Sequence, residues 1–274
     1  MNIMDSKELC LGIEEEVKNF SKSCIIRPSV AVITIGEELV NDKFVKEREE
    51  ACNKAGIYFR YYNFEDNTPE LTIINKIKEL NNDEYVNGIM VDLPMPEKYN
   101  EKRVLNSIIN SKDIDGLTDI NIGRLISGRK SITPCKVQAI MELLKTYEVD
   151  LEGKEVTIIG NSKLVGKPLI NILLNMGSTV TICTEKTLDI KKHIINSDII
   201  ISCINSKGLI QDDMINEGVI AIDAGYTIEG NKIYGDFDTK ASKKASLYAP
   251  VESIENLTVS MILKNTIFCY SNKK

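Results

Sequence analysis

The segment from Glu155 to Glu185 has the residue types of a phosphate-binding turn. It begins EVTIIGNSKLVGKPL, which predicts a strand, a glycine-containing turn and the start of a helix. Gly160 and Gly166 let the backbone turn close to a ligand, and Pro168 suits a first helical turn because no amide donor is needed there. The amides and dipole of such a helix start favour a pyrophosphate. The spacing is G-x5-G rather than G-x-G-x-x-G, so a strand–helix turn without any ligand remains an alternative.

A carboxylate follows the second strand of this segment. Glu185 lies 25 residues past Gly160, near the position where dinucleotide folds place an acid that accepts from the adenosine ribose 2′-hydroxyl. Such an acid repels a 2′-phosphate, so the sequence favours NAD over NADP. A solvent-facing turn glutamate is the alternative, and the neighbouring Lys163 and Lys186 weaken the electrostatic argument.

Short apolar strands alternate with amphipathic helices along the chain and would position this turn. We expect strands at 29–36, 57–64, 86–94, 155–160, 179–184, 198–204, 219–225 and 245–250. We expect helices near 6–22, 41–55, 69–81, 101–110, 136–148, 166–176, 188–195 and 256–270. Apolar strands separated by helices are typical of parallel sheets covered on both faces, so the predicted fold class is α/β.

A loop-rich connection divides the chain. Residues 112–135, KDIDGLTDINIGRLISGRKSITPC, are rich in Gly, Asp and Ser, and enough strands lie on each side for two separate sheets. We therefore predict two α/β domains with a cleft between them, the second a Rossmann-type dinucleotide-binding domain.

Composition limits the partners. The 274 residues are 43% hydrophobic and 27% charged, the balance of a globular protein, and the net charge of −6 argues against nucleic acid. Seven cysteines without a C-x-x-C pair indicate reduced thiols and a cytoplasmic protein. We expect no signal peptide and no membrane span, and the single histidine, His193, argues against a metal site.

Nine segments, in this order and spacing, resemble the methylenetetrahydrofolate dehydrogenase/cyclohydrolase family. They are AVITIGEELVNDKFVKEREEACNKAGI (31–57), NGIMVDLPMP (87–96), KDIDGLTDINIGRL (112–125), PC (134–135), IIGNSKLVGKPLINILL (158–174), TVTICTEKT (179–187), IDAG (222–225), YGDFD (234–238) and APV…LTVSMIL (249–263). The resemblance implies a folate-binding catalytic domain over 1–138, completed by a last helix at 255–274, and an NAD(P)-binding Rossmann domain over 139–254. It also implies a homodimer that acts on a tetrahydrofolate-type substrate. Family members oxidise 5,10-methylenetetrahydrofolate and then hydrolyse the methenyl product in the same cleft.

The resemblance places water activation at a tyrosine and a lysine one helical turn apart, and these positions are Phe44 and Arg48 here. A guanidinium stays protonated and cannot act as a general base, so we expect the usual cyclohydrolase chemistry to be lost. Hydride transfer needs no obligatory proton shuttle and should survive. The family's glutamine is Asp92, and because a buried charge needs a partner, we predict an Arg48–Asp92 ion pair. Two independent surface charges are the alternative.

The family's folate-side aspartate is retained as Asp115, for which a turn-stabilising role is the alternative. The implied catalytic set is Phe44, Arg48, Asp92 and Asp115. The family's glycine-rich folate segment reads ESIENL here, at 252–257, and Ile254 and Glu255 permit close backbone approach less easily than glycine. The implied substrate contacts are Phe44, Val91, Asp92, Leu93, Pro94, Asp115, Ser253 and Ile254.

On the nucleotide side, the family's arginine is Asn161 and its serine after the second strand is Glu185, and both changes favour NAD. Tyr226 follows Gly225, where its ring would either stack on the nicotinamide or block the pocket. The implied contacts to NAD or NADP are Gly160, Asn161, Ser162, Val165, Gly166, Pro168, Thr184, Glu185, Cys203, Asn205, Gly225 and Tyr226.

Two other functions stay open at this point. One is a paralogue that has lost catalysis and binds a nucleotide or another small molecule, and the other is an enzyme whose altered substrate uses the Arg48 charge. An open pocket beside Asp115, Arg48 and the nucleotide turn would favour an enzyme. A pocket filled by Phe44, Tyr226 and Ile254 would favour a binding protein.

Overall fold

The computed structural model describes residues 2–36, 39–230 and 232–272, with the backbone alone for 39–42. These residues form two compact units. Unit 1 contains residues 2–8, 125–128 and 136–258, and unit 2 contains 9–124, 129–135 and 259–272, within the described ranges. The predicted α/β class with two domains is confirmed. The domain ranges 1–138 with 255–274 and 139–254 stay a prediction.

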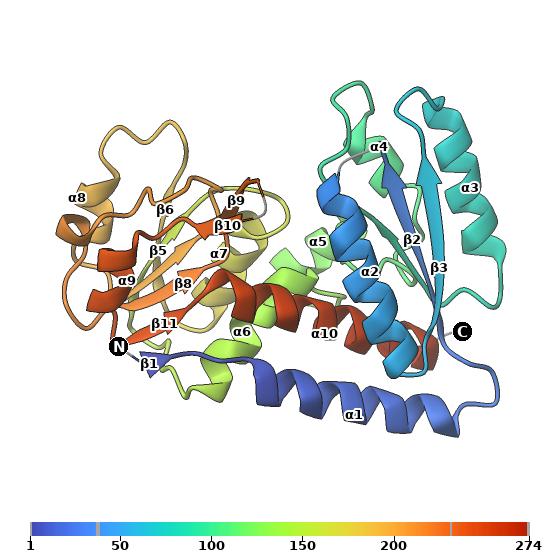
Figure 1. Ribbon diagram of the computed structural model, residues 1–274, viewed down its shortest axis with the longest axis horizontal. Coiled ribbons are helices and arrows are strands. Elements are labelled where there is room, and N and C mark those ends of the chain that lie inside the picture. Colours follow the sequence, from blue (N-terminus) through green and yellow to red (C-terminus); the bar gives the residue numbers. More distant parts are fainter. Residues whose placement is uncertain (1, 37–38, 231, 273–274) are drawn as a thin grey trace. The chain divides into compact units, whose positions relative to one another are not determined.

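Unit 2 is built on a parallel sheet in the order β3-β2-β4. Its strands are β2 (Ser29–Ile35), β3 (Tyr58–Phe64) and β4 (Gly88–Val91). The chain leaves β2 for β3 on one side and returns to β4 on the other, so right-handed crossovers place α2 (Leu39–Lys54) and α3 (Glu70–Asn82) on opposite faces (Figure 1). The central strand β2 is therefore buried along its whole length, which its continuous apolar sequence SVAVITI allows.

Two expectations for the middle of the chain need correction. The helix expected at 101–110 is the shorter α4 (Glu101–Leu105), and the connection 112–135 is not all loop, because it contains α5 (Asp119–Ile126). The hydroxyl of Thr118 accepts from the backbone amide of Asn121 at 3.4 Å, which satisfies a donor at the start of α5. The many turn-forming residues around α5 hid this helix from the sequence pattern.

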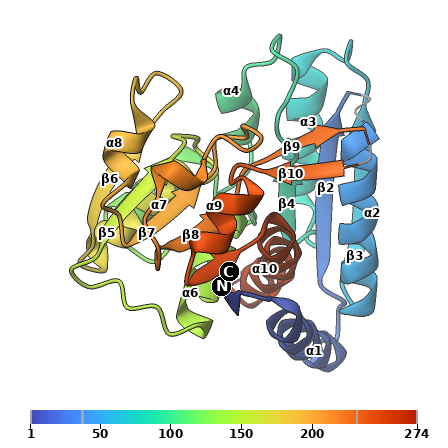
Figure 2. The same cartoon turned by 60° about the vertical axis from the view of Figure 1, so that its left-hand side comes forward.

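Unit 1 contains a parallel sheet in the order β1-β11-β8-β7-β5-β6, of which Figure 2 labels β5 to β8. Its strands are β1 (Asn2–Ile3), β5 (Glu155–Ile159), β6 (Thr179–Cys183), β7 (Ile199–Ser202), β8 (Ile220–Asp223) and β11 (Leu247–Ala249). The remaining elements are α6 (Cys135–Thr146), α7 (Gly166–Asn175), α8 (Ile190–Ile194), η1 (Asp212–Met214), α9 (Thr239–Lys244) and an antiparallel hairpin of β9 (Tyr226–Glu229) and β10 (Lys232–Gly235). The chain passes from β5 outward to β6 and then back to β7 on the other side of β5. Ligands of such sheets bind at the carboxyl ends of the strands at this reversal, here between β5 and β7.

The helix expected at 256–270 begins earlier. Helix α10 runs over Val251–Ser271, so residues 252–255 are helical and not a loop. The carbonyl of Pro250 accepts from the amides of Ser253 and Ile254, and the side chains of Ile254 and Leu257, three residues apart, are fully buried. Residues up to Thr258 belong to unit 1 and the later ones to unit 2, and residues 273–274 of the expected 255–274 lie outside the described residues.

The other helices include α1 (Lys7–Ser23), which is amphipathic with Ile13 and Val17 buried. Among the described residues, we find no helix with the length and apolar character that a membrane crossing requires.

Candidate functional site

The residues implied to act on the folate side meet in unit 2 around an ion pair. Helix α2 presents Phe44 and Arg48 one turn apart, and Asp92 directly follows β4. The guanidinium of Arg48 donates to both carboxylate oxygens of Asp92, with Nη2 and Oδ2 2.7 Å apart. The two side chains are only 8% and 9% exposed. The predicted Arg48–Asp92 ion pair is confirmed, and the alternative of two surface charges is wrong.

The guanidinium of Arg48 has further partners that fix it in place. Its Nε donates to the carbonyl of Phe44 at 3.0 Å, and Nη1 lies 3.5 Å from the sulfur of Met90. Burial tends to lower the pKa of Arg48, but the adjacent Asp92 carboxylate outweighs burial and holds this pKa above its ordinary value. The group is therefore a permanent cation that cannot take a proton from water.

Asp115 lies in a tight turn on the same unit. Gly116 has φ +65°, and a Cβ on it would lie 2.5 Å from the carbonyl oxygen of Ile132, so the turn requires glycine. The amide of Cys135 donates to the carboxylate of half-buried Asp115 at 3.4 Å. Burial, and then the nearby Asp113 carboxylate, raise the pKa of Asp115 to about 7. This carboxyl group can therefore change charge near neutral pH.

The neighbouring Asp113 also stabilises this turn, and the turn-stabilising alternative for Asp115 itself stays open. The buried carboxylate of Asp113 accepts from the amides of Leu117 at 3.2 Å and Thr118 at 2.8 Å, and from the side-chain amide of Asn121 at 2.8 Å.

A side chain that sequence reasoning missed holds the Asp115 turn. The side-chain amide of Asn265, on α10, donates to the carbonyl of Ile114 at 2.8 Å and lies 3.4 Å from both the carbonyl of Thr133 and the sulfur of Cys135. It fastens the two segments on either side of Asp115 to the C-terminal helix. In the sequence, the available signal was an asparagine among the mainly apolar residues of the last predicted helix.

The remaining substrate contacts implied by the resemblance are divided between the units. Val91 is buried at the end of β4. Leu93 and Pro94, which come shortly after it, are joined by a cis peptide bond. Ser253 and Ile254 lie in the first turn of α10, in unit 1, with exposed fractions of 5% and 0%. Ser253 and Ile254 therefore belong to the same unit as the implied cofactor contacts, and Asp115 belongs to the other unit.

In the glycine turn after β5, backbone segments lie too close together for a side chain at Gly160 or Gly166. Gly160 has φ +116°, and a Cβ on it would lie 2.7 Å from the carbonyl oxygen of Cys203; a Cβ on Gly166 would lie 2.0 Å from the carbonyl oxygen of Gly160. Side chains at either glycine would fill this space. A backbone cradle at the start of a ten-residue helix, with Val165, Gly166 and Pro168 buried beneath it, fits the pyrophosphate of a dinucleotide.

Neutral, acidic and basic side chains lie around this cradle, and Lys163 and Lys167 are exposed in the turn and at the helix start. Asn161 and Ser162 are exposed, and the Oγ of Ser162 accepts from the amide of Val165, the residue before α7, at 3.2 Å. Glu185 is exposed in the turn after β6, where the amide of Thr187 donates to the carbonyl of Thr184 at 2.9 Å. This turn lies at the carboxyl end of β6, the strand beside β5. A side chain that binds the adenosine ribose of a dinucleotide lies at this position.

The loops after β7 and β8 bring the other implied cofactor contacts together. Asn205 has φ +61°, and its side-chain oxygen accepts from the amide of Tyr226 at 3.0 Å. A Cβ on Gly225 would lie 2.1 Å from a carboxylate oxygen of Asp236. Cys203 is buried, which raises the pKa of its thiol to about 12, so it does not act as a thiolate.

Two buried carboxylates that sequence reasoning missed hold these loops. Asp236 accepts from the Ser202 hydroxyl at 2.6 Å and from the amides of Ile204 at 3.1 Å and Ser206 at 2.7 Å. Asp223 accepts from the amide of Asp236 at 2.8 Å. Burial raises the pKa of Asp223 to about 7. The segments IDAG and YGDFD contain both aspartates, but their burial could not be read from these letters.

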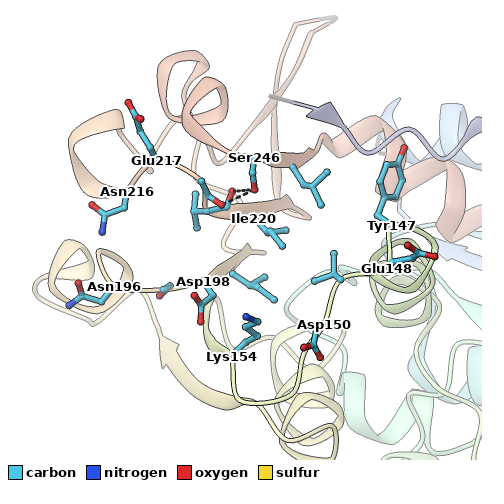
Figure 3. A pocket seen from close by; sticks show the side chains of 16 residues that line it. Tyr147, Glu148, Asp150, Lys154, Asn196, Asp198, Asn216, Glu217, Ile220 and Ser246 are labelled. Atoms are coloured by element: carbon cyan, nitrogen blue, oxygen red, sulfur yellow. Dashed lines mark hydrogen bonds between the residues drawn. The ribbon is translucent and has the colours of Figure 1, made fainter.

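A hollow of about 600 Å³ opens at the opposite edge of the unit 1 sheet, at the amino ends of its strands (Figure 3). Its lining includes Tyr147, Glu148, Asp150, Lys154, Asn196, Asp198, Asn216, Glu217, Ile220 and Ser246. None of the implied site residues lines it. Dinucleotides bind at carboxyl ends, so this hollow is not the nucleotide site.

Comparisons with known proteins find one family along the chain. The family profile described as tetrahydrofolate dehydrogenase/cyclohydrolase, catalytic domain, matches residues 4–115, and the NAD(P)-binding domain of the same family matches 134–274. The bifunctional protein FolD of Campylobacter jejuni (strain RM1221) is 40% identical over 280 residues, covering 100% of this chain and 99% of the relative. The crystal structure of the bifunctional enzyme FolD, methylenetetrahydrofolate dehydrogenase/cyclohydrolase, from Campylobacter jejuni superposes with a TM-score of 0.94 at 39% identity over 99% of each chain. The Trypanosoma brucei methylenetetrahydrofolate dehydrogenase-cyclohydrolase, complexed with NADP cofactor and an inhibitor, gives a TM-score of 0.92 at 28% identity over 97% of this chain and 96% of its own.

Proposed function

The chain belongs to the tetrahydrofolate dehydrogenase/cyclohydrolase family, and on this basis we propose that it oxidises 5,10-methylenetetrahydrofolate with NAD but does not hydrolyse the methenyl product by the family's usual route. The observation that carries the proposal is the Arg48–Asp92 ion pair. It leaves a fixed cation where water activation needs a group that exchanges a proton.

Hydride transfer tolerates this arrangement. The turn after β5 and the loops after β7 and β8 would hold NAD, which when bound would supply a hydride acceptor. Loss of a hydride from the methylene carbon, one C–H bond breaking with both electrons, would leave the folate as a methenyl cation. An unpaired Arg48 would repel that cation, but Asp92 cancels its charge within the pair. Asp115, with a pKa raised to about 7, adds a carboxylate that is partly ionised at neutral pH and can stabilise developing positive charge.

Water attack on the methenyl carbon does not tolerate this arrangement. The attacking water must lose a proton to a base, and a guanidinium bound to Asp92 and to the Phe44 carbonyl cannot accept one. Phe44 also lacks a hydroxyl that would donate or relay a proton. We therefore infer that methenyltetrahydrofolate accumulates as the product.

The cofactor preference follows from the cradle after β5. The backbone at Gly160 and Gly166 would hold the pyrophosphate, and Glu185 would accept from the adenosine ribose. Asn161 supplies no positive charge for a 2′-phosphate. We also infer a homodimer from the family resemblance. We infer a cytoplasmic protein because the seven cysteines form no disulfide.

One absorbance experiment tests the proposal. Purified protein receives methylenetetrahydrofolate with NAD or with NADP, and formation of reduced nicotinamide and decay of the methenyl product are followed separately. We expect reduction with a higher kcat/KM for NAD and methenyl decay at the uncatalysed rate. Absence of reduction with either cofactor refutes the dehydrogenase, and decay well above background refutes our interpretation of Arg48.

A second candidate is a binding protein that has lost catalysis. The burial of Ile254 within α10, in place of a glycine-rich loop, is the observation that favours it. Nucleotide binding without any reduction in the same assay would select this candidate.

A further inference from the structure

Lys136 joins three segments of unit 1 that are far apart in the sequence. Its ammonium lies 2.5 Å from Oε1 of Glu255 on α10 and 3.5 Å from the carbonyl oxygen of Ala224 after β8. It also lies 5.3 Å from the centre of the Tyr226 ring. The side chains of Lys136 and Glu255 are 22% and 20% exposed, and the Oε1 atom itself is buried. The pair is therefore shielded much more than a surface ion pair.

The position of this pair follows from strand order. If the pyrophosphate lies on the turn after β5 and the adenosine ribose meets Glu185 after β6, the dinucleotide extends from β6 across β5 toward β7 and β8. Neighbouring strands are about 4.8 Å apart, so the nicotinamide reaches the loops after β7 and β8. Tyr226 and Ala224 lie at the carboxyl end of β8, beside Lys136.

The backbone at this end is held independently of Lys136. The amide of Tyr226 donates to Asn205, and a Cβ on Gly225 would meet Asp236. Removal of the Lys136 charge therefore changes the electrostatics next to the Tyr226 ring while the loop keeps its other anchors.

We propose that Lys136 and Glu255 lie beside the nicotinamide, where either charge alone would change the relative affinity for the oxidised and reduced ring, and that their pairing keeps this affinity ratio balanced. The oxidised ring is a cation and the reduced ring is neutral, so a unit charge nearby acts on one form and not on the other. Paired, the two side chains nearly cancel. Lys136 without Glu255 disfavours NAD⁺, and Glu255 without Lys136 favours it. This inference rests on the proposed use of a nicotinamide cofactor.

The test measures binding and needs no folate. NADH is titrated by fluorescence and NAD⁺ by competition, and the ratio of the Kd for NAD⁺ to the Kd for NADH is compared among variants of the full chain. Glu255→Gln should raise this ratio and Lys136→Met should lower it, each about five-fold for a charge acting over roughly 10 Å in a partly shielded site. Lys136→Met/Glu255→Gln should return the ratio to within two-fold of wild type, and Lys136→Arg should leave it there. Opposite shifts cannot come from a general loss of packing.

The exposed pair of Lys191 on α8 with Asp213 is the control, because Lys191 lies in the same unit but outside the loops after β7 and β8. Its side chains are 47% and 68% exposed, so Lys191→Met should leave the ratio unchanged. Shifts in one direction for both single variants, or an equal shift in Lys191→Met, would overturn the proposal. Failure of the wild type to bind either nucleotide would overturn it together with NAD use, whereas binding without dehydrogenase activity would remove the proposed function alone.

Discussion

Replacing Arg48 with methionine tests the chemical basis of the folate-side site. Methionine fills a similar volume with a flexible apolar chain, so the change mainly removes the charge and its hydrogen bonds. Asp92, only 8% exposed, then loses both guanidinium contacts. A buried carboxylate without a partner is strongly unfavourable.

The size of the effect is limited by proton uptake. An unpaired buried carboxylate costs several kcal/mol, but the folded protein can avoid this by holding a proton. Protonating a carboxyl group whose unfolded pKa is about 3.9 costs about 4 kcal/mol at pH 7 and about 1.5 kcal/mol at pH 5. The folded variant then holds a proton that the unfolded chain releases, so the stability of the variant falls as pH rises over this window.

Urea unfolding followed by circular dichroism at pH 5 and pH 7 measures this effect. We expect Arg48→Met to lose about 4 kcal/mol at pH 7, roughly 10 °C in Tm, and much less at pH 5. Arg48→Met/Asp92→Asn should recover most of the loss at pH 7. Lys43→Met, which breaks an exposed pair with Glu47 on the same helix, is the control and should cost less than about 0.5 kcal/mol. A loss that is equal at both pH values and persists in the double variant would refute the argument.

Four further outcomes follow from the site. The kcat/KM of the dehydrogenase should rise with pH through about 7 as Asp115 ionises, and Asp115→Asn should abolish this step in the pH–rate profile. Because burial raises the pKa of Asp223 to about 7, the stability of the wild type should fall as the pH rises from about 4 to 7, and the Tm of Asp223→Asn should depend less on pH over this range. Gly160→Ala, with a Cβ 2.7 Å from the Cys203 carbonyl, should weaken NADH binding at least about ten-fold in a fluorescence titration. Asn265→Ala should lower kcat/KM for methylenetetrahydrofolate by about ten-fold while the KM for NAD stays the same, because the Asp115 turn loses its anchor.

Local patterns predicted the parts of the fold in which apolar residues follow one period. The run SVAVITI is buried along its length as β2, and the segment EVTII is β5, followed by the expected turn and helix. The Arg48–Asp92 contact was predictable for a different reason. Both residues fall at positions that the resemblance places inside the site, and burying either charge alone would be too unfavourable.

Features that depend on distant segments were not predictable. Lys136 and Glu255 are 119 positions apart, and each side chain alone has the sequence character of a surface charge. The burial of Asp223 and Asp236 depends on β7, β8 and the hairpin that follows. The early start of α10 is stabilised by the burial of Ile254 and Leu257, which depends on distant segments, in addition to Glu252 in its first turn.

In the proposed reaction, the Lys136–Glu255 pair would act on the nicotinamide and the Arg48–Asp92 pair on the folate. Hydride transfer removes a positive charge from the nicotinamide and creates one on the folate, so a fixed cation beside either ring would bias the equilibrium between bound reactants and products. An uncompensated Lys136 would favour reduction of the cofactor, and an uncompensated Arg48 would oppose formation of the methenyl cation. Because Glu255 and Asp92 each neutralise one of these cations, the protein can keep a lysine and an arginine at its two reacting sites without driving hydride transfer in one direction.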